Sequence, residues 1–311
     1  MSLELPRRVR IREVGPRDGF QNEPEVIPTA DKIRLIDELA GTGLERLEVT
    51  SFVRPDVIPQ LADAEQVLAA ANLPASVQAT VLVPNERGLE RALALGDRFQ
   101  QVSGFVSASE THNRKNLNRS VAESLAELER MIGRARGEGL RAGTVISVSF
   151  GCPYEGRVEP ERVFELARHL IADGAQEIGF ADTTGMANPV AVLAFFAAAR
   201  EALGEAELTA HFHNTRGQGL ANVLAALEAG CESFESSFGE IGGCPVPAGA
   251  TGNIATEDLV SMLHEMGIET GIELDALLAV ARHLAASLGR PLGSHTLLAG
   301  PVSWGGLPAT S

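Results

Sequence analysis

Two thirds of the way along the chain lies the segment Ala210-His211-Phe212-His213-Asn214-Thr215-Arg216. Residues 208–213 are typical of a strand, and a strand points residues i and i+2 to the same face. His211 and His213 are therefore expected to lie side by side, with Phe212 facing the opposite way. Two convergent imidazoles suit a divalent metal if distant parts of the chain supply further ligands. The simpler interpretation is a pair of strand histidines that are hydrogen-bonded to their neighbours.

The chain on both sides of this segment repeats one unit: an apolar run, a polar loop, an amphipathic helix, and a glycine before the next run. Strands are predicted at 9–15, 44–52, 76–83, 99–106, 143–150, 177–181, 208–213 and 233–238, with helices near 31–41, 63–71, 86–95, 120–137, 160–173, 188–203 and 218–229. Eight alternating units of this kind favour an α/β fold, a (β/α)8 TIM barrel. The alternative is an open doubly wound sheet, but no Gly-x-Gly-x-x-Gly motif follows the first strand.

Two further helices are predicted after the last strand, at 256–266 and 274–288. Residues 1–288 are therefore expected to form one catalytic domain. Residues 289–311 are rich in glycine and proline and show little regular pattern, so an irregular tail is predicted there.

Composition excludes several classes of function. A net charge of −15 argues against nucleic acid as a partner. No run approaches the roughly 18 apolar residues that span a bilayer, and the start of the chain lacks an apolar signal core. Three cysteines (Cys152, Cys231 and Cys244) are too few for a disulfide framework, which fits a reducing compartment. We therefore expect a cytoplasmic protein that contacts no membrane, and a homo-oligomer is left open.

Reactive residue types recur at the predicted strand ends, where TIM barrels place their chemistry. Asp18 follows the first strand and could ligate a cation, and the adjacent Arg17 could face an anionic or enolate oxygen. The other candidates at strand ends or in the loops that follow are Gln21, Glu48, Asp182, Cys244 and Asn253. The agreement between the fold pattern and these positions is the core of the functional prediction.

Each candidate also has a structural interpretation. Arg17 and Asp18 could form only a salt-bridged loop, with Glu48 as a buried partner of the arginine. Asp182 precedes Thr-Thr-Gly and could accept hydrogen bonds in an Asx turn. Cys231 is expected in the core, whereas Cys152 fits either a structural position or one near the site.

Six segments together resemble one known family. They are 13–19 (Glu-Val-Gly-Pro-Arg-Asp-Gly), 107–110 (Ser-Ala-Ser-Glu), 151–156 (Gly-Cys-Pro-Tyr-Glu-Gly), 211–215 (His-Phe-His-Asn-Thr), 242–245 (Gly-Gly-Cys-Pro) and 252–259 (Gly-Asn-Ile-Ala-Thr-Glu-Asp-Leu). This combination resembles the 3-hydroxy-3-methylglutaryl-CoA lyases, metal-dependent TIM barrels related to isopropylmalate and homocitrate synthases. The resemblance covers nearly the whole barrel.

The resemblance implies a residue set and a reaction. Asp18, His211, His213 and Asn253 would bind Mg²⁺ or Mn²⁺, which accept mixed oxygen and nitrogen ligands. Loss of the proton of the substrate's tertiary 3-hydroxyl would drive retro-Claisen cleavage to acetyl-CoA and acetoacetate or the matching keto acid. Arg17 would stabilise the enolate, and Cys244 would protonate the enolate carbon or form part of a lid that excludes water. His211 could also transfer protons. Glu48 is expected to orient Arg17, and Asp182 to assist the proton relay.

Departures from the family pattern leave the acyl group open. Arg216 stands where an aromatic residue is common, and Glu240-Ile241 stand where Gly-Leu is usual. Arg216 could bind a distal carboxylate or a CoA phosphate, and Asn113 and Lys115 could also meet the CoA phosphates. Two alternatives to the lyase are a transferase that condenses acetyl-CoA with a 2-oxo acid, and a non-catalytic barrel that binds acyl-CoA.

Overall fold

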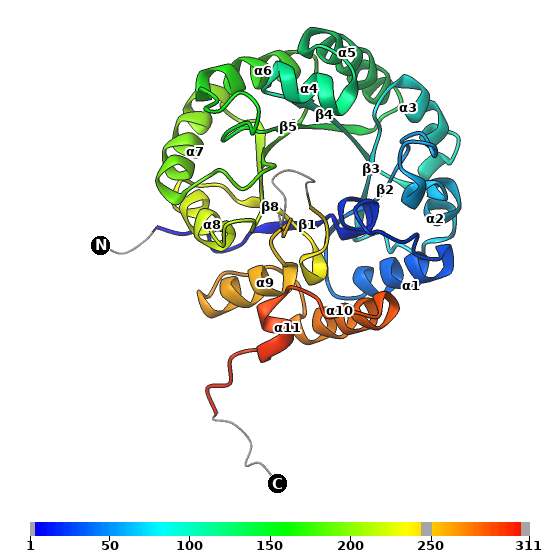
Figure 1. Cartoon of the computed structure of the whole chain (residues 1–311), viewed down its shortest axis with the longest axis vertical. Helices are drawn as coiled ribbons and strands as arrows, with labels where there is room; N and C mark the ends of the chain where they lie inside the picture. Colours follow the sequence, from blue (N-terminus) through cyan, green and yellow to red (C-terminus); the bar gives the residue numbers. More distant parts are fainter. Residues whose placement is uncertain (1–3, 244–250, 306–311) are drawn as a thin grey trace.

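Eight parallel strands form a closed barrel in the order of the chain (Figure 1), which confirms the predicted TIM barrel. The structure, a computed structural model, describes residues 4–243 and 251–305. β1 pairs with β8 from Arg10↔Ser233 to Glu13↔Ser236, so the first strand closes on the last. The strands are β1 (Arg10–Glu13), β2 (Arg46–Ser51), β3 (Gln78–Leu82), β4 (Gln101–Ser107), β5 (Arg141–Ser147), β6 (Glu177–Asp182), β7 (Glu207–Phe212) and β8 (Ser233–Ser236).

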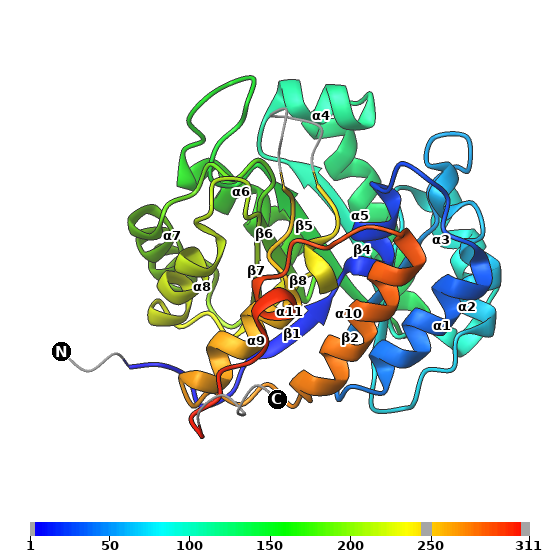
Figure 2. The same cartoon turned by 60° about the horizontal axis from the view of Figure 1, so that its bottom comes forward.

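Helices surround the barrel, and the last three gather beside β1 and β8 (Figures 1 and 2). They are α1 (Thr29–Ala40), α2 (Ala64–Ala70), α3 (Glu86–Leu93), α4 (Glu110–Leu117), α5 (Val121–Gly137), α6 (Pro160–Ala172), α7 (Pro189–Leu203), α8 (Gly219–Glu228), α9 (Thr256–Glu265), α10 (Leu274–Leu288) and α11 (His295–Ala299). Short helical turns are η1 (Gly15–Gly19), η2 (Pro59–Leu61), η3 (Gly96–Arg98) and η4 (Phe238–Glu240). Across 4–243 and 251–305, none of these helices has the length and apolarity needed to cross a bilayer.

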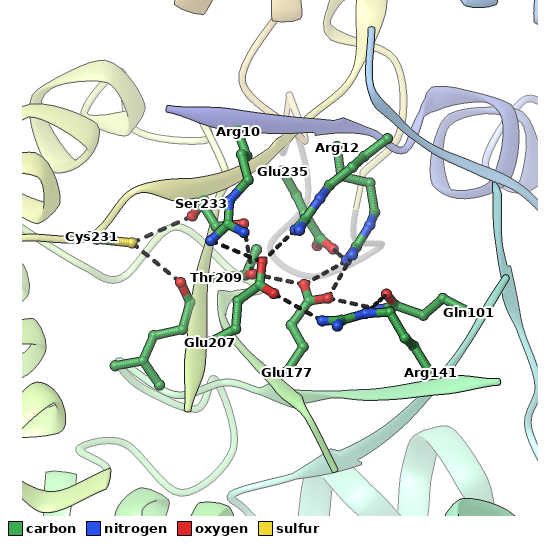
Figure 3. A network of polar contacts seen from close by, with 12 residues as sticks. Arg10, Arg12, Gln101, Arg141, Glu177, Glu207, Thr209, Cys231, Ser233 and Glu235 are labelled. Atoms are coloured by element: carbon green, nitrogen blue, oxygen red, sulfur yellow. Dashed lines mark hydrogen bonds and ion pairs between the residues drawn. The ribbon is translucent and has the colours of Figure 1, made fainter. Parts of the chain in front are cut away.

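The strands separate an apolar layer from a polar barrel interior. Phe212 of β7 and Phe180 of β6 both pack against Phe196 of α7, with ring centroids 6.4 and 5.9 Å apart. Because side chains alternate along a strand, Thr209 of β7 and Glu177 of β6 point the other way, into the barrel (Figure 3). The apolar core therefore lies between the strands and the helices.

The sequence patterns act locally as expected. The helix predicted near 160–173 is α6, and it buries Val163, Leu166, Ala167 and Leu170 along one face, as an amphipathic helix does. Gly43, between α1 and β2, has φ +90°, and a Cβ there would lie 2.2 Å from the carbonyl oxygen of Gly271. No other residue fits this turn without a shift of the backbone.

α4 was not predicted from the sequence pattern. Its residues are mostly polar, and within it only His112 and Asn113 are buried, so it lacks the apolar stripe by which helices are recognised. The side chain of Ser109 caps its first turn by accepting a hydrogen bond from the backbone N–H of His112 at 3.1 Å.

The predicted tail also contains regular structure. α11 begins after Ser294, whose buried hydroxyl donates to Asp258 of α9 at 3.0 Å. The same carboxylate accepts hydrogen bonds from the backbone N–H groups of His295 and Thr296, at 3.0 and 2.6 Å. The start of the tail is thus fastened to the catalytic domain.

Candidate active site

Six of the predicted site residues line a cavity at the mouth of the barrel where the strands end. The cavity has a volume of about 870 Å³, and its lining includes Arg17, Asp18, Gln21, Lys115, His211 and His213. A cavity of this size at this end of a TIM barrel is the usual position of an active site.

Three side chains in the cavity form a candidate metal site. A carboxylate oxygen of Asp18 and one ring nitrogen each from His211 and His213 lie within 4.8 Å of one another. Asn253 joins them, because its Nδ2 donates to Oδ2 of Asp18 at 2.7 Å. Its Oδ1 is buried and has no hydrogen-bond partner among the residues that the structure describes. A buried oxygen left without a partner is a group that a bound cation would satisfy, so this set fits a divalent metal.

Local backbone geometry brings these residues together. η1 follows β1 directly and turns Asp18 into the cavity, with the Asp18 N–H donating to the carbonyl of Val14 at 2.7 Å. Gly19 allows this turn to pack closely, because a Cβ there would lie 2.4 Å from Ile241. His213 and Asn253 are held beside each other by an antiparallel backbone bridge.

Electrostatics at the site favours the metal-binding forms of Asp18 and His213. Burial raises the pKa of Asp18, but the charge of Arg17 and the histidines outweigh burial and hold this pKa below its ordinary value. Burial and the neighbouring His211 lower the pKa of His213 to about 3, so its imidazole is neutral. Burial lowers the pKa of His211, but the hydrogen bond to Glu235 and the negative charges of Glu235 and Asp18 together outweigh burial, so this pKa is raised overall. Carboxylate and neutral imidazole are the forms that bind metals.

Arg17 lies between two carboxylates. Its Nε donates to Glu48 at 2.5 Å, and its Nη1 donates to Asp18 at 2.6 Å. Both salt-bridge interpretations from the sequence are therefore present. They hold the guanidinium beside the candidate metal ligands, where it can also donate to a substrate oxygen.

Asp182 occupies the turn after β6. Its Oδ1 accepts from the backbone N–H groups of Met186 and Ala187 at 2.7 and 3.1 Å, four and five residues on. An Asx turn joins residues two positions apart, so Asp182 accepts backbone hydrogen bonds but does not form that turn. Its Oδ2 is buried and unpaired within the described chain, and burial raises the pKa of Asp182 to about 6. A carboxyl group with this pKa can exchange a proton near neutral pH.

The predicted substrate contacts lie in different surroundings. Gln21 donates to Asp18 at 3.0 Å, and Lys115 lies 4.9 Å from the centre of the Tyr154 ring, at the cavity lining. Arg216 is exposed, and its Nη1 donates to the carbonyls of Thr184 and Gly185 at 2.7 and 2.6 Å.

Asn113 is a correction to the sequence prediction. Its side chain is fully buried, and its Nδ2 donates to the carbonyls of Arg119 and Ser120 and to the hydroxyl of Ser124. Its Oδ1 accepts from the N–H of Ser107. The amide fastens the two ends of α4, so it has no free group to offer a CoA phosphate. Cys244, the predicted acid, lies outside the described residues.

Sequence reasoning missed one residue of the site. Glu235 of β8 lines the cavity and lies 3.0 Å from Nδ1 of His211. The sequence does show Glu235 as a charged residue between Phe234 and Ser236 in the predicted strand 233–238. Such a residue must point into the barrel and needs a partner there.

The chain is similar to known proteins over nearly all of its length. A family model described as HMGL-like matches residues 8–284. The chain belongs to this family. It is 44% identical to hydroxymethylglutaryl-CoA lyase YngG of Bacillus subtilis, over 95% of the chain and 98% of that protein. It is also 44% identical to (R)-citramalyl-CoA lyase of Chloroflexus aurantiacus, over 94% of the chain and 95% of the relative.

A solved structure of an HMG-CoA lyase from Acinetobacter baumannii, in complex with coenzyme A and 3-methylmalate, superposes with a TM-score of 0.90. It is 41% identical and covers 94% of this chain, and this chain covers 95% of it. The resemblance seen in the sequence motifs is thus confirmed, and this HMGL-like chain is a carbon–carbon lyase of the hydroxymethylglutaryl-CoA lyase type.

Proposed function

We propose that this chain cleaves 3-hydroxy-3-methylglutaryl-CoA, or a close 3-hydroxyacyl-CoA, to acetyl-CoA and a keto acid with the help of Mg²⁺ or Mn²⁺. The observation that carries this proposal is the convergence of Asp18, His211 and His213 within 4.8 Å, beside Arg17 and inside a cavity. A divalent cation bound there would lower the pKa of the substrate's tertiary hydroxyl and polarise its oxygens.

The protein's own residues would then divide the remaining tasks. Loss of the hydroxyl proton breaks the C2–C3 bond and leaves the enolate of acetyl-CoA, whose negative charge lies partly on the thioester oxygen. Arg17 is held by Glu48 in position to donate to that oxygen as the charge develops. His211 and Asp182 are the candidates for carrying protons, and Cys244 is proposed to protonate the enolate carbon.

A second substrate is supported by a specific observation. The citramalyl-CoA lyase relative is as similar to this chain as the hydroxymethylglutaryl-CoA lyase relative is, at 44% identity for both. The exposed Arg216, at the position where the family often has an aromatic residue, is a proposed contact for a carboxylate or a CoA phosphate. Gln21 and Lys115 are further proposed substrate contacts.

Free thiols at Cys152 and Cys231 support a reducing, cytoplasmic setting.

The test is a panel of CoA thioesters with Mg²⁺ or Mn²⁺, in which acetyl-CoA release is followed by chromatography with and without chelator. We expect metal-dependent release from 3-hydroxy-3-methylglutaryl-CoA or from citramalyl-CoA. Release of free CoA from acetyl-CoA and a 2-oxo acid would favour the condensing transferase instead. Binding of thioesters without turnover would favour the non-catalytic barrel.

A matched pair of arginine variants tests the role of Arg17. Loss of one enolate-stabilising donor typically lowers turnover by about 10²–10³-fold, so we expect this loss in Arg17→Met, with substrate binding retained. Arg87→Met, in an exposed arginine of α3, should turn over normally. Turnover of Arg17→Met within threefold of the unmodified protein would disprove the proposed role.

A further inference from the structure

Behind the candidate metal ligands lies a buried ionic network that the lyase chemistry does not use directly (Figure 3). It contains Arg12, Glu177 and Glu235, whose side chains are each less than 5% exposed. Buried charges of this kind persist only where they are paired, and they are often retained for a reason other than stability.

The network reaches the site at one atom pair. A carboxylate oxygen of Glu235 lies 3.0 Å from Nδ1 of His211. An ionised carboxylate can only accept hydrogen bonds, so Nδ1 of His211 must carry the proton. Nε2 of the same ring faces His213, at 3.1 Å from Nε2 of that residue. In the neutral ring, the contact with Glu235 therefore leaves the lone pair of Nε2 directed at the candidate metal position.

Strand register sets this arrangement. Glu235 of β8 pairs with His211 of β7 on one side and with Arg12 of β1 on the other. The three residues therefore lie at one level of the barrel, with their side chains directed inward. The contact between Glu235 and His211 follows from barrel closure and does not depend on a loop.

Arg12 fixes Glu235 from the other side. Its Nη1 donates to Glu235 at 2.9 Å and to Glu177 at 2.8 Å, and its Nη2 donates to Glu177 at 2.6 Å. Glu177 also accepts from Gln101 and Thr209, both at 2.7 Å. The Glu177 carboxylate, which is itself fully hydrogen-bonded, thus holds the Arg12 guanidinium in place beside Glu235.

We propose that Glu235 is a positioning residue that holds His211 in its Nδ1–H form with Nε2 toward the metal, and that Arg12 holds Glu235 in place. This inference rests on the metal site of the proposed function. Carboxylates that hold a metal-ligating histidine in this way typically contribute about 10–100-fold to metal affinity.

Glu235→Gln is the most direct test, because the amide cannot serve both neighbours. If its oxygen accepts from Arg12, its NH₂ group faces Nδ1 of His211 and favours the opposite tautomer, with the proton on Nε2. We expect Mn²⁺, titrated by calorimetry, to bind this variant about 10–100-fold more weakly than it binds the unmodified protein. Glu235→Asp, which keeps the carboxylate, should recover part of the affinity.

Thr209→Val is the matched control. Thr209 lies two residues before His211 on β7 and donates to Glu177, whereas the imidazole of His211 is hydrogen-bonded to Glu235 and His213. This variant should lower the melting temperature while binding Mn²⁺ within twofold of the unmodified protein. If Thr209→Val weakens Mn²⁺ binding as much as Glu235→Gln does, the network acts only through general stability and the proposal is wrong.

A second measurement does not depend on whether the variants fold. In Mg²⁺-loaded protein labelled with ¹⁵N-histidine, long-range proton–nitrogen correlations should show His211 protonated at Nδ1. A proton on Nε2 would overturn the proposal, as would unchanged Mn²⁺ affinity in Glu235→Gln. If the unmodified protein binds no Mn²⁺, the failure belongs to the proposed function; if it binds and the variant binds equally, only the role of Glu235 fails.

Discussion

The two halves of the barrel interior are built differently. In the lower half, near the amino ends of the strands, acidic groups are paired with arginines: Glu177 with Arg12, and Glu207 with Arg46 and Arg141. In the upper half, near the carboxyl ends, Asp18 and two imidazoles converge, and the amide oxygen of Asn253 is buried with no partner in the described part of the chain.

This difference separates stability from function. The lower half satisfies its charges with groups from its own strands, so it needs nothing from outside. The upper half leaves donor atoms facing one point, which suits a cation that the chain does not itself supply. TIM barrels generally carry the residues that stabilise the fold at the amino end of the strands and the catalytic residues at the carboxyl end.

Breaking the lower half should have the largest effect on stability. Glu177→Ala removes the main partner of the buried Arg12, and removal of one partner of a buried ion pair costs about 3–5 kcal/mol. Urea unfolding followed by circular dichroism measures this loss. Arg168→Ala, which removes an exposed pair with Glu161 on α6, should cost less than about 1 kcal/mol. Equal losses in the two variants would contradict the comparison.

Breaking the upper half should have the largest effect on turnover. Asp18→Ala removes the carboxylate ligand, and a metal supplies several kcal/mol of transition-state stabilisation, so we expect a loss of about 10³-fold or more in kcat. Acetyl-CoA release from the best thioester of the panel provides the measurement. Asp97→Ala, at an exposed position in η3, should retain full activity. Turnover of Asp18→Ala within tenfold of normal would show that the upper cluster does not hold the metal.

The cation itself should sharpen the comparison by stabilising the fold. A ligand that binds only the folded state adds about 2.7 kcal/mol at 100 times its Kd. We therefore expect Mn²⁺ to raise the melting temperature, and a chelator to reverse the rise. The same addition should leave the melting temperature of Asp18→Ala unchanged. A shift of equal size in that variant would indicate binding elsewhere.

The smallest expected effect is a pH dependence of the free energy of unfolding that arises from Glu257, whose carboxylate contacts η4. Both carboxylate oxygens of Glu257 lie near the Gly239 N–H, at 2.9 and 3.0 Å, and burial raises the pKa of Glu257 to about 8 from an ordinary 4.5. Between these values the folded protein holds a proton that the unfolded chain has released. Stability from this group is therefore complete below about pH 4.5 and is lost as the pH rises through about 8.

Glu257→Gln tests this sign, because the amide does not ionise. We expect the free energy of unfolding of this variant to fall less between pH 6 and pH 9 than that of the unmodified protein. Glu228→Gln, at an exposed position of α8, serves as the control and should follow the unmodified protein. An equal fall in Glu257→Gln and the unmodified protein would mean that the carboxyl is ionised in the folded state throughout this range.

The sequence predicts the barrel and the candidate ligands for a physical reason. Alternating apolar runs and helices have periods that can be read locally, and the carboxyl ends of parallel strands must share one mouth. Asp18, His211 and Asn253 were therefore expected to meet although they are far apart in the chain. The polar helix α4 could not be predicted in this way, because its sequence has no apolar stripe. Its position is fixed by its cap and by the hydrogen bonds of Asn113.

The role of Glu235 could not be predicted in the same way. A charged residue in a barrel strand can be assigned to the interior, but its partners depend on strand register after closure. Arg12 lies on β1, and the two residues become neighbours only because β1 and β8 pair. The same dependence explains why the substrate role of Asn113 was predicted wrongly: its partners Arg119, Ser120 and Ser124 come from the turn that follows α4 and from the start of α5.

The closing pair of strands has a consequence for how the molecule is made. The hydrogen bond from Asn253 to Asp18 joins positions 235 residues apart, so the candidate ligand set stays incomplete until residue 253 has left the ribosome. A growing chain that already carries both histidines and Arg17 still lacks the eighth strand and the segment that follows it. A translation product that stops before residue 253 therefore lacks Asn253 and cannot form this hydrogen bond.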